Sequence, residues 1–178
     1  MQALPTLTDG MIVLRPWVDD DADDLFREIQ DPEVVRWLNI DMPYTLDDAA
    51  GFIAQVVERW EQRAGAHFVV ADAGDGRFLG YLGVLDAGKS MKVVEIVYWV
   101  AAAGRRRGVA RRAVALALEW VLLELAPERI ELAMVDGNEA AIRVAEANGF
   151  QLREIVSGGA TLDGRPADKR IYDFSLPN

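Results

Sequence analysis

One stretch of this chain decides how it folds, and it reads Val93-Val94-Glu95-Ile96-Val97-Tyr98-Trp99-Val100-Ala101-Ala102-Ala103-Gly104-Arg105-Arg106-Arg107-Gly108-Val109-Ala110. Residues 93–100 are apolar, β-branched and aromatic, which predicts a buried strand. Residues 105–108 carry three arginines and a glycine where a long helical pattern begins. The free amide groups and the dipole at a helix start bind phosphate, and glycine lets phosphate approach the backbone. The sequence therefore predicts a phosphorylated cofactor at the C-terminal end of this strand.

The composition excludes several classes of protein. A length of 178 residues predicts one domain, spanning residues 1–178. The chain has no cysteine, which excludes disulfides, thiolate metal sites and a cysteine nucleophile. His67 is the single histidine, so we expect no metal centre. No apolar run is long enough to cross a membrane, and residues 1–10 do not form a secretory signal, so we expect a cytoplasmic location and no membrane partner.

The formal net charge of −10 narrows the choice of partners. Nucleic-acid binding depends on neutralising phosphates, so this charge argues against a nucleic-acid partner. The charge is compatible with a cationic substrate drawn in by the overall field. The charge is also compatible with a role in solubility alone.

The remaining hydrophobic patterns predict a mixed α/β or α+β architecture, in which one central sheet is largely antiparallel. We expect about four main helices around a seven-stranded sheet. Thr45 and Asp48 predict a capping box at the start of one helix, and Pro127 ends the longest. Between the last two strands, Ser157–Lys169 is expected to form a flexible loop. The expected strands cover residues 11–15, 67–72, 77–85, 93–100, 129–135, 150–156 and 170–176.

Four separate motifs resemble the GCN5-related N-acetyltransferase (GNAT) superfamily, and within it the RimJ/RimL type that acetylates ribosomal-protein N-termini. Arg105-Arg106-Arg107-Gly108-Val109-Ala110 fits the cofactor motif of the superfamily, which is Gln or Arg, two residues, Gly, one residue, then Gly or Ala. The others are an Asn-led helix ending in Gly-Phe (residues 138–150), Leu14-Arg15-Pro16, and residues 164–168 before Ile171-Tyr172. The resemblance covers almost the whole chain and implies the GNAT fold.

The resemblance implies acetyl-CoA as the co-substrate and no metal. The backbone of Trp99 and Val100 would bind the pantetheine arm, and the residues of the motif, Arg105, Arg106, Arg107, Gly108, Val109 and Ala110, would hold the pyrophosphate. Asn138 would contact the pantetheine or orient the thioester, although it is also a natural helix N-cap. The acceptor would be a small-molecule amine or a peptide N-terminus. Dimers are common in the subgroup, so a homodimer is one expected assembly.

Amide formation needs a neutral amine, donors for the oxyanion and a leaving thiolate. Glu95 is our candidate general base, because a glutamate within an apolar strand costs stability unless it is paired or functional. The resemblance places a tyrosine or a serine on the Asn-led helix as proton donor, but this chain has Ala145 and Ala141 there. Either the thiolate leaves unassisted, or a water or Tyr98 donates. His67 could also serve as the base, but it opens a predicted strand, which favours a structural role.

Alternatives remain open at this stage. Trp37 and Tyr44, with Trp17, are candidates to line the acceptor pocket, and they also fit as packing residues. The missing proton donors favour a second function class, a catalytically weak acyl-CoA-binding or sensor module with the same fold. A dinucleotide-binding domain is excluded because no G-x-G-x-x-G follows an early strand.

Overall fold

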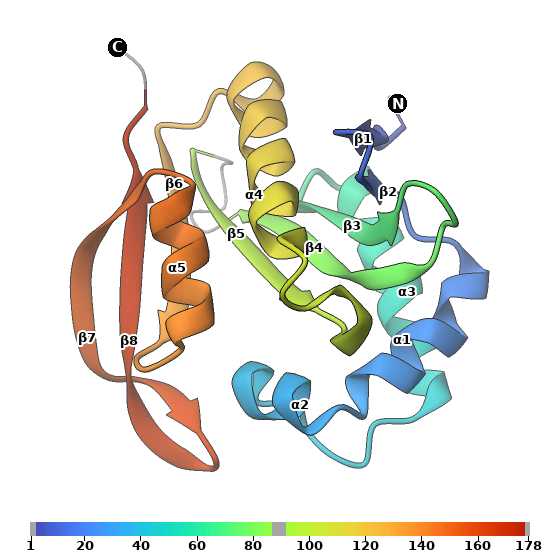
Figure 1. Ribbon diagram of the computed structural model, residues 1–178, viewed down its shortest axis with the longest axis horizontal. Helices are drawn as coiled ribbons and strands as arrows, with labels where there is room; N and C mark the ends of the chain where they lie inside the picture. The colour runs from blue at the N-terminus through green and yellow to red at the C-terminus, as the bar shows by residue number, and fades with distance from the viewer. Residues whose placement is uncertain (1–2, 87–91, 177–178) are drawn as a thin grey trace.

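The computed structural model describes residues 3–86 and 92–176, which form a sheet of eight strands with helices on both faces (Figure 1). The strand order is β1-β2-β3-β4-β5-β6-β8-β7. All neighbouring strands are antiparallel except β5 and β6, which are parallel. The strands are β1 (Leu7–Thr8), β2 (Ile12–Arg15), β3 (Gly65–Asp72), β4 (Phe78–Asp86), β5 (Val93–Val100), β6 (Arg129–Val135), β7 (Phe150–Leu162) and β8 (Arg165–Phe174).

Five α-helices are present in the described residues, and they divide between the two faces of the sheet. Alternate residues of β5 point to opposite faces of the sheet. Ile96 lies in the core under α4 and α5, whereas Trp99 lies in the core under α1 and α3. Within the described ranges no helix is both long and apolar enough to span a membrane. The helices are α1 (Ala22–Ile29), α2 (Pro32–Leu38), α3 (Leu46–Glu61), α4 (Val109–Trp120) and α5 (Glu139–Ala147).

The predicted fold class is confirmed, with small differences in the number of elements. The described residues contain eight strands and five α-helices, where the sequence predicted seven strands and about four helices. The additional strand β1 is only two residues long and pairs with β2, which explains why no periodic pattern reveals it. The capping box is confirmed, since the Asp48 amide donates to Thr45 Oγ1 and the Thr45 amide donates to the Asp48 carboxylate.

The prediction of a flexible loop at Ser157–Lys169 is wrong. β7 and β8 continue through this segment as a long hairpin, and Leu162 pairs with Arg165 across a two-residue turn. The turn residues Asp163 and Gly164 both have positive φ, 50° and 72°, which matches the twist of a hairpin. A register shift between Val156 and Ala160 breaks the alternation of side chains, so the sequence does not show a regular strand pattern there.

Candidate functional site

The sheet opens between β5 and β6. The two parallel strands are in register only from Val93 to Glu95, opposite Arg129 to Glu131. Beyond this point β5 continues to Val100 paired with β4 alone, while β6 stays paired with β8 (Figure 1). The backbone of residues 96–100 therefore has no strand beside it on this edge, where the Val100 carbonyl accepts from Arg105 Nε at 3.3 Å. An edge without a neighbouring strand is what an extended, amide-containing ligand needs in order to add to a sheet.

A row of free amide groups lies at the end of this edge. The amides of residues 106–111 have no hydrogen-bond acceptor among the described residues, because the first bond into α4 is made by the Arg112 amide. Gly108 is the N-cap of α4 with φ 74°, and a Cβ at that position would meet no described atom within 4 Å. Free amides around an open space at a helix start form a site for a phosphate group. The segment predicted to hold the pyrophosphate thus carries free amides beside an open space, and its role as a pyrophosphate site stays a prediction.

The arginines near this loop divide into two groups. Three of them form ion pairs with carboxylates: Arg105 with Asp31 (2.9 Å), Arg107 with Asp72 (3.3 Å) and Arg112 with Asp9 (2.6 Å). Arg106 and Arg111 are exposed and have no carboxylate partner among the described residues. The sequence alone does not distinguish these five arginines. Of the five, Arg106 and Arg111 are the two whose charge no carboxylate of the described residues neutralises, so they are available to bind an anion.

We expect Arg106→Gln to weaken acetyl-CoA binding about threefold to tenfold, because it removes a charged donor that no carboxylate neutralises. The matched variant Arg107→Gln should change the affinity less than twofold, because Arg107 already forms an ion pair with Asp72. Calorimetric titration of both variants measures the difference. Equal losses would show that the ion pair with Asp72 does not withhold Arg107 from the ligand.

Glu95 lies at the point where the two strands separate, on the face of β5 that carries Trp99. Its side chain is half-buried, and it is in direct register with Glu131 of β6. Burial raises the pKa of Glu95, the charge of Lys169 opposes this, and the charge of Glu131 adds to it. A carboxylate with a raised pKa is closer in strength to a base that works near neutral pH.

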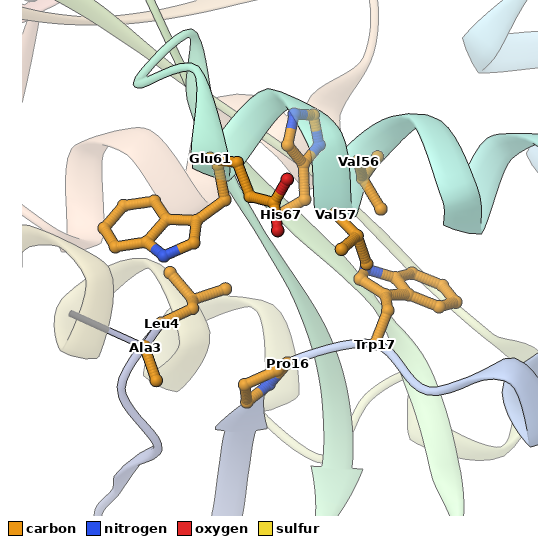
Figure 2. A pocket seen from close by; sticks show the side chains of 9 residues that line it. Ala3, Leu4, Pro16, Trp17, Val56, Val57, Glu61 and His67 are labelled. Atoms are coloured by element: carbon orange, nitrogen blue, oxygen red, sulfur yellow. The ribbon is translucent and has the colours of Figure 1, made fainter. Parts of the chain in front are cut away.

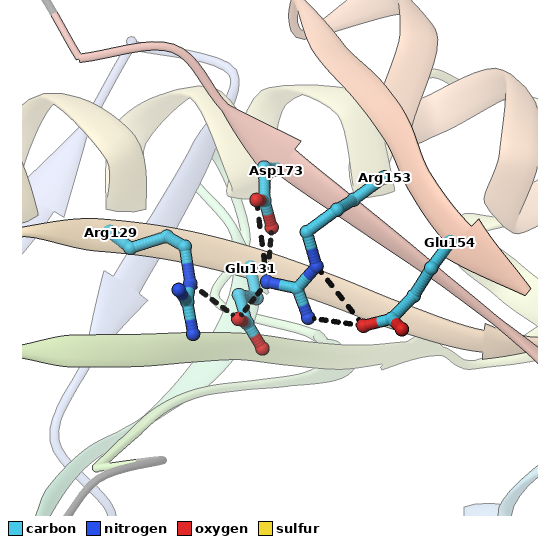
Figure 3. A network of polar contacts seen from close by, with 5 residues as sticks. All are labelled: Arg129, Glu131, Arg153, Glu154 and Asp173. Atoms are coloured by element: carbon cyan, nitrogen blue, oxygen red, sulfur yellow. Dashed lines mark hydrogen bonds and ion pairs between the residues drawn. The ribbon is translucent and has the colours of Figure 1, made fainter. Parts of the chain in front are cut away.

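Glu131 belongs to a network of charged side chains on the same face of the sheet (Figure 3). Arg153 binds Glu131 at 2.6 Å, Asp173 at 3.1 Å and Glu154 at 2.8 Å, and Arg129 binds Glu131 at 2.6 Å. Burial acts to raise the pKa of Glu131, but hydrogen bonds from Arg153 and Arg129 lower it overall. Glu131 therefore stays ionised beside Glu95, and its two arginine partners limit the repulsion between the carboxylates.

Tyr98 lies on the opposite face of β5 and packs against the core under α4 and α5. Its hydroxyl is buried and has no hydrogen-bond partner among the described residues, and burial raises its pKa. Ala145 on α5 is completely buried in the same core, and Ala141 packs against it. Asn138 caps α5 by accepting from the Ala141 amide at 3.1 Å, so at least part of its role is structural.

An acetyltransferase (GNAT) domain model matches residues 11–151. This chain belongs to the GNAT acetyltransferase family. The N-acetyltransferase YoaA of Bacillus subtilis (strain 168), described as uncharacterized, is 21% identical to it over 97% of this chain and 98% of that protein. The predicted N-acetyltransferase of the GNAT superfamily is thus confirmed.

Two solved structures share the fold of this chain. Mycobacterium smegmatis RimJ in complex with CoA-disulfide has a TM-score of 0.85 at 20% identity, covering 96% of this chain and 87% of that one. Spermidine N-acetyltransferase from Vibrio cholerae, in complex with CoA and spermine, has a TM-score of 0.80 at 17% identity, covering 93% and 96%. Both of these solved structures are complexes, one with CoA-disulfide and the other with CoA and spermine.

Trp37 and Tyr44, which were predicted to line the acceptor pocket, lie in the N-terminal part of this GNAT domain, before α3. Trp37 is on α2, where its indole donates to Glu33 at 3.3 Å and the Arg36 guanidinium stacks on it at 4.9 Å. Tyr44 is half-buried and packs against the core under α1 and α3. No described contact joins either residue to the opening between β5 and β6, so their assignment to the acceptor pocket stays a prediction.

His67 has a different environment from Glu95. It is buried on β3, separated from β5 by β4, and its Nδ1 lies 2.8 Å from the Tyr81 hydroxyl. Burial, with a smaller contribution from Arg59, lowers its pKa to about 4, so the ring is neutral at physiological pH. A structural role explains this histidine better than a role as the base.

The structure adds two features that sequence reasoning missed. Asp31 is the N-cap of α2 and also binds Arg105, so it links α2 to the loop of residues 105–108. At the other end of α2, Arg36 pairs with Asp163 in the β7–β8 turn at 3.4 Å. The helix thereby connects the loop to the hairpin, as its place in Figure 1 indicates. The dipeptide Asp31-Pro32 signals only a helix start, so no local pattern could reveal these pairings.

Proposed function

We propose that this protein is an acetyl-CoA-dependent N-acetyltransferase that acts on a primary amine, either a small molecule or a peptide N-terminus. The main support is the separation of β5 from β6. The pairing of the two strands ends at Glu95, and β5 then leads to the segment whose amides, at residues 106–111, are free. A net charge of −10 favours acceptors that are cationic in solution. Bound acetyl-CoA would supply an activated acetyl group as a thioester.

In the proposed reaction Glu95 and Tyr98 each transfer one proton, and backbone amides of β5 bind the oxyanion. Glu95 accepts a proton from the ammonium group of the acceptor, directly or through water, so that the nitrogen lone pair becomes available. The amine attacks in a ternary complex, because the chain has no cysteine to carry the acetyl group. Amides on the unpaired edge of β5 stabilise the developing oxyanion. As the carbon–sulfur bond breaks, Tyr98 Oη gives a proton to the departing sulfur, and the extra proton on the attacking nitrogen returns to the Tyr98 oxygen through water.

The second candidate function is an acyl-CoA-binding or sensor module without significant turnover. The alanines at positions 141 and 145 favour it, because they leave α5 without a hydroxyl facing the core. Release of CoA thiol from acetyl-CoA in the presence of an amine panel separates the two functions. The assay has no background from the protein, since the chain contains no cysteine. Binding of acetyl-CoA without thiol release for any amine would establish the sensor function instead.

We expect Tyr98→Phe to lower turnover about tenfold to a hundredfold with little change in acetyl-CoA affinity. The unpartnered hydroxyl costs the fold a buried polar group, so its removal should leave the free energy of unfolding unchanged or raise it. Steady-state kinetics and thermal unfolding of the same variant test both statements. Tyr81→Phe is a matched control, because it removes a hydroxyl bonded to His67 and should reduce stability rather than turnover. Wild-type turnover in Tyr98→Phe would assign the proton to water.

A further inference from the structure

Lys169 carries a positive charge that no carboxylate of the described residues neutralises. It lies on β8, in register with Val135 of β6 and Val156 of β7, and it is half-buried. Within residues 3–86 and 92–176 its ammonium group makes no ion pair or hydrogen bond, whereas Lys92 pairs with Glu128 at 2.6 Å. A partly buried ammonium group without a partner costs free energy, so its presence here needs an explanation.

Lys169 and Glu95 lie on the same face of the sheet. Val135 is opposite Lys169, and Glu131, four residues earlier on β6, is opposite Glu95. Side chains alternate along a strand, so Glu131 and Val135 share one face, and their register partners share it with them. The charge of Lys169 lowers the pKa of Glu95 against the effect of burial, so the ammonium group is near enough to act on this carboxylate.

Glu95 and Lys169 do not bind each other, although their charges are opposite. Neither side chain makes an ion pair among the described residues. The neighbouring carboxylates on this face, Glu131 and Asp173, are already bound by Arg153 (Figure 3). One unpaired carboxylate and one unpaired ammonium group are therefore close enough to sense each other's charge and too far apart to form a bond.

A pocket elsewhere in the molecule lacks this combination of charges (Figure 2). It has a volume of about 320 Å³ and lies between the N-terminal segment, the end of α3 and the start of β3. Figure 2 shows Glu61 beside it, but none of the described residues that line it is a lysine or an arginine. Its unsatisfied polar atoms, Trp17 Nε1 and His67 Nε2, are buried from solvent. This pocket therefore offers no matched pair of charges to a ligand.

We propose that Lys169 is a specificity-determining residue that binds a carboxylate group of the acceptor. The inference rests on the proposed function, in which Glu95 receives the ammonium group of the acceptor. A free amino acid carries both groups, and their charges are opposite to those of Glu95 and Lys169. A peptide N-terminus has an amide carbonyl in place of this carboxylate. The preferred acceptor is therefore a small amino acid rather than a peptide.

Matched pairs of a free amino acid and its amide test the carboxylate while the side chain stays the same. Glycine, leucine and phenylalanine, each with its amide, are titrated calorimetrically into the protein with CoA and assayed for turnover with acetyl-CoA. At least one free acid should bind fivefold or more tightly than its amide and have the higher kcat/KM. This preference opposes intrinsic reactivity, because an amine next to an amide has a pKa of about 8 and is more often neutral at pH 7.

Variants of Lys169 test whether this residue causes the preference. Lys169→Met should lower the ratio of kcat/KM for the free acid to kcat/KM for its amide at least tenfold, and Lys169→Arg should largely keep it because the charge remains. The ratio is measured because the loss of this charge also raises the pKa of Glu95, which affects both acceptors alike. Lys92→Met and Glu61→Gln are controls that remove a charge elsewhere, and they should change the ratio less than twofold.

Binding and turnover together separate this inference from the proposed function. Tighter binding of free acids that Lys169→Met removes, with no turnover of any acceptor, would refute acetyl transfer and support the carboxylate site. Turnover in which every amide is used as well as its acid, or a wild-type ratio in Lys169→Met, would overturn the inference alone. Neither turnover nor a difference in binding within any pair would overturn both.

Discussion

Replacing Glu95 with glutamine is expected to lower turnover about ten- to a thousandfold at pH 7, with acetyl-CoA affinity within twofold of the wild type. Glutamine keeps the shape of the side chain but cannot accept the ammonium proton. Because burial raises the pKa of Glu95, activity of the wild type should fall as the pH drops through that raised value, where the carboxylate becomes protonated. In Glu95→Gln, the fall in turnover at acid pH should disappear from the pH profile. The difference in turnover between this variant and the wild type should shrink at high pH, where free amine is plentiful.

The stability of the same variant separates a functional role from a structural one. A carboxyl group whose folded-state pKa is raised above its unfolded value destabilises the fold once it ionises, so its contribution falls as the pH rises through the folded pKa. Glutamine resembles the protonated form. Glu95→Gln should therefore be no less stable than the wild type at neutral pH, as thermal unfolding can measure. Unchanged turnover from pH 6 to 9, or a clear loss of stability, would make Glu95 a structural residue.

Replacing Gly108 with valine is expected to weaken acetyl-CoA binding at least tenfold. A Cβ at this position meets no described atom within 4 Å, so the valine side chain would extend into the open space before the free amides of residues 106–111. A phosphate group could then no longer approach those amides. Calorimetric titration of the folded variant measures the loss directly.

The control for Gly108→Val must account for backbone strain. Gly108 has φ 74°, and a residue other than glycine in this region costs about 1–2 kcal/mol. Gly164 is a close match, with φ 72° and no described atom within 4 Å of a Cβ, but it lies in the β7–β8 turn. Gly164→Val should lose similar stability and keep its acetyl-CoA affinity. Equal affinity losses in both variants would attribute the effect to the backbone rather than to the ligand site.

The elements that the sequence predicted well depend on neighbours along the chain. The capping box at Thr45, the amphipathic face of α4 and the strand of residues 93–100 all follow from contacts within a few residues. The arginine-rich loop with Gly108 at a helix start is equally local, and it led directly to the family. The hairpin of β7 and β8 was missed because a bulge hides its alternation, although the Asp163-Gly164 pair is a local hairpin signal.

The site itself depends on contacts between distant parts of the chain, which only the tertiary structure decides. Asp31 and Asp72 determine that Arg105 and Arg107 are paired while Arg106 is not. The register of β5 and β6 determines that Glu95 faces another carboxylate, and the place where the two strands part decides which amides are free. Sequence by itself determined most of the helices and strands and the family they belong to, because local interactions suffice for these. Charge pairing and strand register act across the fold, so no local pattern encodes them.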